Sequence, residues 1–160
     1  MPYTKIIIHA VWGTKNRAHF LTDYIRTAVI AHIREYAKEK GIYIDRLNGY
    51  TDHLHCLFAL NANMSIAKVM NLLKGESSYW INKQLLTSSK FEWADEYYAA
   101  SVSESALNRV RAYIDNQEQY HKMKTFQQEY HTLINSALKG GVNEGDGVNE
   151  EGGVKKRARS

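Results

Sequence analysis

Two hydrophobic patterns follow each other in the first third of the chain. Residues 6–12 are mostly β-branched and apolar, which is typical of a buried strand. Thr22 is then placed to cap a helix that Gly41 would end. The apolar positions of this helix recur every three or four residues and are Ile25, Val29, Ile33, Tyr36 and Ala37. We therefore predict a strand over 6–12, followed by a helix between Thr22 and Gly41.

The middle of the chain predicts two strands, a helix and a further strand. Residues 42–47 and 53–60 are typical of strands, and the pair Asn48-Gly49 between them is a turn signal. Ser65 can cap a helix whose inward stripe consists of Ile66, Val69, Met70, Leu73 and Trp80. Residues 97–102 predict a fourth strand. Ser101 and Glu104 have capping-box spacing before a last long helix of roughly residues 103–122.

The first six predicted elements follow the order strand, helix, strand, strand, helix, strand. This is the split β-α-β order of ferredoxin-like domains. We therefore predict an α+β fold, in which helices pack on a ferredoxin-like antiparallel sheet and a C-terminal helix carries Tyr113. Such a fold hosts many functions, so the function has to be inferred from the site.

Composition limits the class of protein. The 160 residues, 44% of them hydrophobic, suffice for one domain with a core. No apolar run is long enough to cross a bilayer, and His9 interrupts the first apolar run too early for a signal peptide. A single cysteine, Cys56, excludes an intramolecular disulfide, so we expect a cytoplasmic protein. The net charge of +4 is compatible with nucleic acid without indicating it.

The composition changes after Lys139. Six of the ten glycines fall in residues 140–160, where Gly-Val-Asn-Glu occurs at 141–144 and again at 147–150. This segment has almost nothing to bury. We predict that residues 1–139 form the folded domain and that residues 140–160 form a disordered, Gly/Glu-rich tail.

The first chemical motif is Asp52-His53-Leu54-His55. Because side chains alternate across a strand, His53 and His55 project from one face and Leu54 from the other. Two neighbouring imidazoles can form a bidentate metal site. Alternatively, one histidine is exposed and the other is satisfied by a backbone hydrogen bond. Cys56 is expected on the core face, as a small hydrophobic residue and not as a nucleophile.

The second motif is Tyr113-Ile114-Asp115-Asn116-Gln117. Positions four apart lie on nearly the same helical face, so Tyr113 and Gln117 can reach one site together. They could equally be a tyrosine at the core edge and a solvated glutamine. With His53 and His55, the glutamine gives two nitrogens and one oxygen, which suit magnesium or manganese. The metal would activate a phosphate toward attack by the tyrosine, which alone is a poor nucleophile.

Four segments in this order make the chain similar to a known family. They are His9-Ala10-Val11-Trp12-Gly13-Thr14-Lys15-Asn16-Arg17, Asp52-His53-Leu54-His55, Lys74-Gly75-Glu76-Ser77-Ser78 and Tyr113-Ile114-Asp115-Asn116-Gln117. Over about residues 2–133 the chain resembles the single-tyrosine HUH transposases of the insertion sequence 200/605 type. The resemblance makes residues 1–139 the catalytic domain.

The resemblance implies a role for each motif residue. His53, His55 and Gln117 would hold the divalent metal, Mg or Mn, and Tyr113 would be the nucleophile. The enzyme would cleave and rejoin single-stranded DNA at hairpin-marked ends through a 5′-phosphotyrosine. It would be a homodimer in which the tyrosine helix of one subunit can serve the histidines of the other.

Several residues have competing interpretations. Tyr120 shares the helical face of Tyr113 and is the rival nucleophile. His121 is a spare ligand or, more simply, a cation near a helix end. Asp52 orients a histidine or is an exposed turn residue. Candidate phosphate contacts, which could equally be solvated surface charges, are Lys15, Arg17 and Lys74.

Two other functions fit the same residues. A replication initiator or relaxase would use the same HUH and tyrosine chemistry, but such proteins usually carry further domains. A domesticated protein that binds nucleic-acid hairpins without cleaving them would belong to a different class.

Overall fold

The computed structural model describes residues 2–141, which fall into two compact units divided between Lys122 and Met123. The first unit is built on a four-stranded sheet, with strand order β2-β3-β1-β4 and every pair antiparallel. The strands are β1 (Ile7–Gly13), β2 (Tyr43–Tyr50), β3 (His53–Ala59) and β4 (Tyr98–Ser101). The predicted α+β class and the ferredoxin-like order of the first six elements are confirmed.

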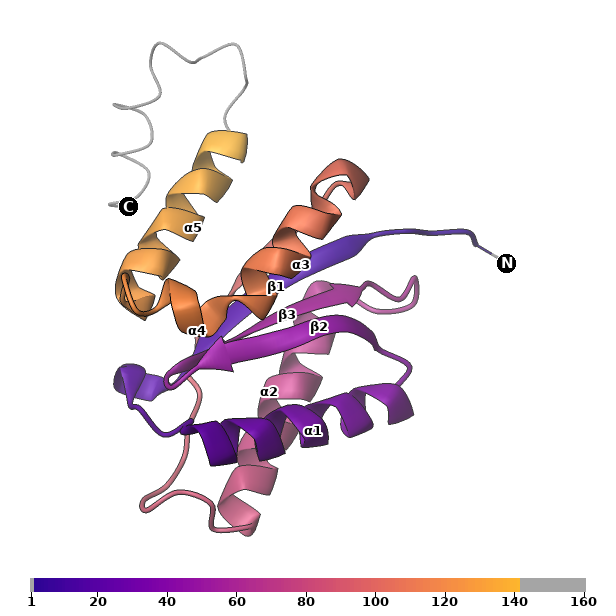
Figure 1. Cartoon of the computed structure of the whole chain (residues 1–160). Helices are drawn as coiled ribbons and strands as arrows, with labels where there is room; N and C mark the ends of the chain where they lie inside the picture. The colour runs from indigo at the N-terminus through magenta and orange to yellow at the C-terminus, as the bar shows by residue number, and fades with distance from the viewer. Residues whose placement is uncertain (1, 142–160) are drawn as a thin grey trace. The chain divides into compact units, whose positions relative to one another are not determined.

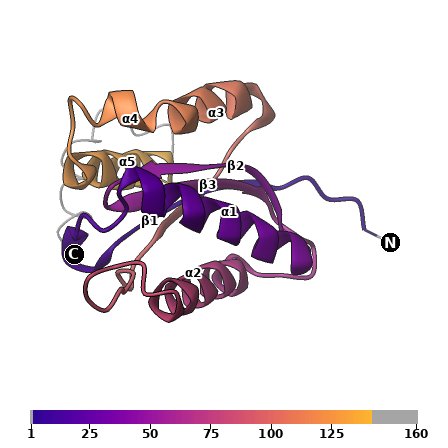
Figure 2. The ribbon, with the colours of Figure 1, turned by 60° about the horizontal axis from the view of Figure 1, so that its bottom comes forward.

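Helices cover both faces of this sheet (Figures 1 and 2). One face carries α1 (Asp23–Glu39) and α2 (Ile66–Lys83), and the opposite face carries α3 (Leu107–Asp115) and α4 (Gln117–Tyr120). Two 3₁₀ turns, η1 (Lys15–Arg17) and η2 (Glu104–Ala106), follow β1 and β4. The sheet therefore separates a layer of two long helices from the short helices that carry Tyr113 and Gln117.

The hydrophobic core lies between the sheet and the layer of α1 and α2. Alternate residues of β1 and β3 point into it and are almost fully buried. These residues are Ala10, Trp12, Leu54, Cys56 and Phe58. Each large apolar side chain buried here contributes about 1.5–3 kcal/mol relative to exposure. Cys56 belongs to this core, as the alternation predicted. Packing of this core holds β3 in place, and therefore also positions the side chains that β3 presents on its other face.

The predicted turn at Asn48-Gly49 is wrong, because both residues lie inside β2. The chain reverses at Thr51 and Asp52, after Tyr50. Gly49 is needed for close approach of the strands, since a Cβ there would collide with the backbone oxygen of His53.

The predicted last helix is also wrong in its continuity and its cap. Residues 103–122 form η2, α3 and α4, with a break at Asn116, whose φ of −101° and ψ of 19° are not helical. Ser101 belongs to β4, and Ser103 holds the cap position, where its hydroxyl contacts the Ser105 hydroxyl and does not cap the helix backbone. Asparagine and aspartate side chains compete with helical hydrogen bonds, which favours a break after Asp115.

The second unit contains α5 (Phe126–Gly141), which the sequence analysis did not anticipate. Its start is a reciprocal cap, because the Thr125 amide donates to the Gln128 side chain and the Gln128 amide donates to the Thr125 hydroxyl. Gly140 and Gly141 still belong to this helix, and residues 142–160 of the predicted tail lie outside the described residues. Between residues 2 and 141, no helix combines the length and hydrophobicity of a membrane span.

Candidate active site

The candidate site lies on the sheet face that α3 and α4 cover. Strand alternation places a group of polar and aromatic residues on this face. They are His9 from β1, Asn48 and Tyr50 from β2, His53 and His55 from β3, and Tyr98 from β4. The side-by-side projection of His53 and His55 expected from the His-x-His spacing is present, with ring centroids 5.1 Å apart.

His53 lies between an acid and an amide. Its Nδ1 is 2.9 Å from Oδ1 of Asp52, which is 5% exposed and therefore not the exposed turn residue of the alternative interpretation. Its Nε2 is 2.9 Å from Oε1 of Gln117, the first residue of α4. The same amide oxygen lies 3.0 Å from Nε2 of His121, which directly follows α4. Gln117 is thus the residue through which α4 meets β3.

His55 lies between another histidine and the tyrosine helix. Its Nδ1 is 2.9 Å from Nε2 of His9, and the two rings are stacked with centroids 5.1 Å apart. The Tyr113 ring stands edge-on to His55, with centroids 5.3 Å apart. Tyr120 packs edge-on against Tyr113, 5.4 Å away, and against His121, 5.1 Å away. The ring of Tyr113 therefore contacts His55, and the rival Tyr120 packs against Tyr113.

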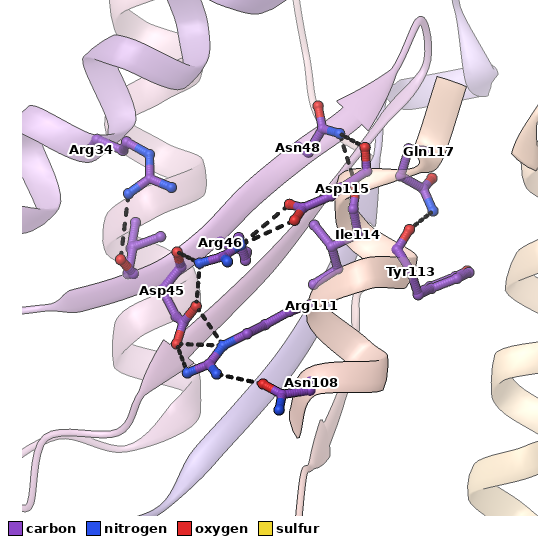
Figure 3. A network of polar contacts seen from close by, with 11 residues as sticks. Arg34, Asp45, Arg46, Asn48, Asn108, Arg111, Tyr113, Ile114, Asp115 and Gln117 are labelled. Atoms are coloured by element: carbon purple, nitrogen blue, oxygen red, sulfur yellow. Dashed lines mark hydrogen bonds and ion pairs between the residues drawn. The ribbon is translucent and has the colours of Figure 1, made fainter. Parts of the chain in front are cut away.

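An ion-pair network docks the tyrosine helix on the edge strand β2 (Figure 3). Asp45 occupies an irregularity in β2, where the register shifts between Ile44 and Arg46. Its carboxylate accepts hydrogen bonds from Arg111 of α3, the shortest of 2.6 Å, and from Arg46 at 2.9 Å. The hydrogen bond to Asp45 raises the pKa of Arg111 above its ordinary value. Arg46 also pairs with Asp115 at the end of α3, at 3.3 Å.

Asn48 completes this docking at the point where α3 ends. Its Nδ2 donates to the backbone oxygens of Ile114 at 2.9 Å and Asp115 at 3.4 Å. The last carbonyls of a helix have no partner within the helix, so a side chain from another element satisfies them here. Thus Asn48, expected in a turn, instead caps the helix that carries Tyr113.

The three candidate phosphate contacts lie on other elements than the histidines, two in η1 and one in α2. Lys15 pairs with Glu92 at 3.5 Å, and Arg17 lies in η1 with a φ of 54°. Lys74 on α2 donates to the backbone oxygens of Ala94 and Asp95, at 2.8 and 3.0 Å. Burial lowers the pKa of Lys74, and its side chain lines a cavity of about 460 Å³ beside α2. Their role toward phosphate stays a prediction.

Sequence reasoning gave no chemical role to His9 or Tyr98. Both lie on the face of the histidine pair, with ring centroids 5.8 Å apart, and burial raises the pKa of Tyr98 above its ordinary value. A signal was present for His9, because a polar residue inside a buried apolar strand requires a polar partner. For Tyr98, the sequence offered no comparable signal.

Comparison with known proteins identifies the family. The sequence model for "Transposase IS200 like" matches residues 2–117, which is more than half of the chain. The chain belongs to the IS200-like transposase family. The matched region contains both histidines of β3, Tyr113 and Gln117, and it ends at the first residue of α4.

Similar proteins agree with this assignment to the IS200-like transposases. The transposase for insertion sequence element IS200 of Salmonella typhimurium is 28% identical over 121 residues, which cover 72% of this chain and 78% of that protein. The ISDra2 transposase TnpA of Deinococcus radiodurans is 24% identical over 115 residues, covering 68% of this chain and 81% of that protein.

Solved structures share the fold. A crystal structure of a putative transposase from Deinococcus radiodurans matches with a TM-score of 0.59 and 25% identity, covering 72% of this chain and 93% of that one. A REP-associated tyrosine transposase bound to a REP hairpin also has a TM-score of 0.59, at 13% identity, with 76% and 72% of the two chains covered. At that identity, the second likeness concerns the fold alone.

Proposed function

We propose that this IS200-like transposase cleaves and rejoins single-stranded DNA at hairpin-marked ends, through a covalent 5′-phosphotyrosine on Tyr113 and with a divalent metal. One observation carries the proposal. The phenol ring of Tyr113 stands 5.3 Å from the ring of His55, and the Gln117 amide oxygen lies 2.9 Å from Nε2 of His53, all within one chain.

The residues present fit a divalent cation. The Asp52 carboxylate can only accept, so a neutral His53 donates a hydrogen bond from Nδ1–H to Asp52 and turns a lone pair at Nε2 toward Gln117. Two lone pairs facing each other at 2.9 Å are the arrangement of two ligands of one cation. Adjacent ligands of an octahedral ion, each ~2.1 Å from it, are separated by ~3 Å. His53, Gln117 and His55 would hold the ion, and this mixed nitrogen and oxygen set suits Mg or Mn.

The chemistry follows from the positions of these groups. A bound metal ion would polarise the scissile phosphate and offset charge on its oxygens. Tyr113 attacks the phosphorus through its phenol oxygen, the bond from phosphorus to the 3′ oxygen breaks, and the phenol proton is lost as the departing 3′ oxygen gains one. A second 3′-hydroxyl then attacks the phosphotyrosine and restores the phenol. Bond energy is conserved, so the protein supplies mainly position and electrostatics.

The geometry favours assembly of this site within one chain. Tyr113 and the histidines that its ring contacts belong to the same unit, and Asp45 and Asn48 hold the tyrosine helix on that unit's own β2. A homodimer in which the helices are exchanged would have to break these contacts in both chains. DNA hairpins are the proposed partner because a structure with this fold contains a bound REP hairpin.

Covalent capture tests the proposal. The full chain is incubated with labelled single-stranded hairpin DNA and Mg²⁺ or Mn²⁺, and adducts are separated on a denaturing gel. We expect an adduct that disappears in Tyr113→Phe and His55→Ala and persists in the matched variant Tyr120→Phe. Hairpin binding without an adduct would refute the enzyme and favour a binding protein that does not cleave. Loss of the adduct in Tyr120→Phe alone would move the nucleophile to Tyr120.

A further inference from the structure

His9 and His55 share one hydrogen bond between two ring nitrogens. The Nε2 of His9 lies 2.9 Å from the Nδ1 of His55, and the rings are inclined by only 16°. The contact is fixed by strand register, because His9 in β1 pairs with Leu57 and Val11 pairs with His55. His9 is 6% exposed and is flanked edge-on by Tyr98 and Tyr113. Its ring is therefore held on three sides by neighbours that leave little rotational freedom.

A hydrogen bond between two neutral imidazoles can be formed in two ways. If His55 carries its proton on Nδ1, it donates to His9 and keeps a lone pair on Nε2. If His9 carries its proton on Nε2, it donates to His55, whose own proton then occupies Nε2 and blocks that nitrogen as a metal ligand. The position of one proton thus decides whether His55 can bind a metal through Nε2.

In the neighbouring His53, the hydrogen-bond partner fixes which ring nitrogen carries the proton. Asp52 can only accept, so it holds the proton of neutral His53 on Nδ1 and leaves Nε2 for a metal. One ligand nitrogen of His53 and one of His55 lie within 4.8 Å of each other. If His9 accepts from His55 as Asp52 accepts from His53, both strand histidines present Nε2 to the same ion. Ligand histidines ordinarily donate the proton of the other ring nitrogen to such a partner.

We propose that His9 is a positioning residue for His55: it adopts the tautomer protonated on Nδ1, accepts a hydrogen bond from Nδ1 of His55, and so holds Nε2 of His55 ready to bind the divalent cation. This inference rests on the metal site of the proposed function. It assigns to His9 the part that Asp52 plays for His53, and it makes β1 a contributor to the site.

Metal affinity, measured without DNA, tests the assignment. Mn²⁺ is titrated into the full chain by calorimetry, with three substitutions compared. His9→Phe keeps the ring shape but has no acceptor, and we expect it to weaken Mn²⁺ binding by about 10–100-fold. His9→Gln offers an amide oxygen near the former Nε2 and should restore most of the affinity. His32→Phe, which removes a half-buried histidine on α1 with its own ring stack and carboxylate partner, is the matched control and should not change the affinity.

The tautomer is read independently from two-bond ¹⁵N–¹H spectra of ¹⁵N-histidine-labelled protein, with and without Mg²⁺. We expect His9 and His55 both to carry the proton on Nδ1. A proton on Nε2 of His9 would overturn the inference, as would equal Mn²⁺ affinity of His9→Phe and the unchanged chain. Failure of the unchanged chain to bind Mn²⁺ would instead refute the metal site of the proposed function, and the spectra would still decide the tautomer of His9.

Discussion

Gly49 lies in β2 beside the site, where a side chain would collide with the backbone of β3, so replacing it with alanine should destabilise the protein. The added Cβ would collide with the backbone oxygen of His53 and would lie 2.9 Å from the Cα of Leu54. Real Cβ contacts are essentially never shorter than 3.0 Å, so the two strands must move apart. Both obstructing atoms are backbone, so a change of side-chain rotamer cannot relieve the contact.

The size of the effect follows from this displacement. Moving the strands apart stretches ladder hydrogen bonds of ~2.9 Å out of bonding range, and each such bond is worth ~0.5–1.5 kcal/mol. Inserting a methyl group into a packed region adds ~1–3 kcal/mol. We therefore expect Gly49→Ala to lower the free energy of unfolding by about 2–4 kcal/mol. Mn²⁺ affinity should fall as well, because the displaced backbone carries His53.

Gly75 provides the matched control, and urea unfolding followed by tryptophan fluorescence is the assay. Gly75 lies inside α2, and a Cβ there would meet nothing within 4 Å. Gly75→Ala should raise the free energy of unfolding by about 0.5–1 kcal/mol, since alanine costs less backbone entropy in a helix. A loss below about 1 kcal/mol in Gly49→Ala would refute the close approach of the strands.

Three further predictions concern the helix, the core and the assembly. Asp45→Asn removes the acceptor charge that holds α3 on β2, so amide hydrogen exchange in α3 should accelerate. Asp23→Asn, which removes an exposed carboxylate on α1 that pairs with Arg26, should leave exchange in α3 unchanged, and equal exchange in both variants would contradict the docking role. Burial raises the pKa of Cys56 from 9.0 to about 12, so its thiol should resist alkylation at pH 8 until the chain unfolds. Because the folded pKa of Cys56 is higher than the unfolded one, its contribution to the free energy of unfolding is fully present below pH 9 and is lost as the pH rises toward 12. A Cys56→Ala variant should lack this alkaline loss of stability, and an identical pH profile of the two proteins would contradict the assignment. Mixing Tyr113→Phe with His55→Ala chains should give no covalent DNA adduct, whereas restored adduct would place the site between two chains.

The alternation of side chains in a strand made the arrangement of the two histidines in β3 predictable. His53 and His55 had to share a face, and Leu54 and Cys56 had to share the other, whatever the partner strands were. Helical spacing likewise brought Tyr113 close to Gln117, even though the helix breaks between them at Asn116. Both patterns are local and depend only on the type of element.

The remaining features depend on contacts between distant segments. Asn48-Gly49 has the composition of a turn, yet Asn48 caps α3 and Gly49 makes room for β3. The role of His9 requires the register of β1 on β3, which no local pattern gives. The helix α5, by contrast, was predictable from local sequence, because Thr125 and Gln128 have the spacing of a reciprocal cap.

The central claim is that the phenol beside the histidine pair forms the bond to DNA, and peptide mapping of the adduct tests it most directly. The protein is trapped on hairpin DNA with Mn²⁺, trimmed with nuclease, and digested with a protease that cuts after glutamate. Cleavage after Glu104 and Glu118 separates the two tyrosines into peptides 105–118 and 119–129. We expect the nucleotide mass on peptide 105–118, at Tyr113. A nucleotide on peptide 119–129, or on neither peptide, would contradict the account.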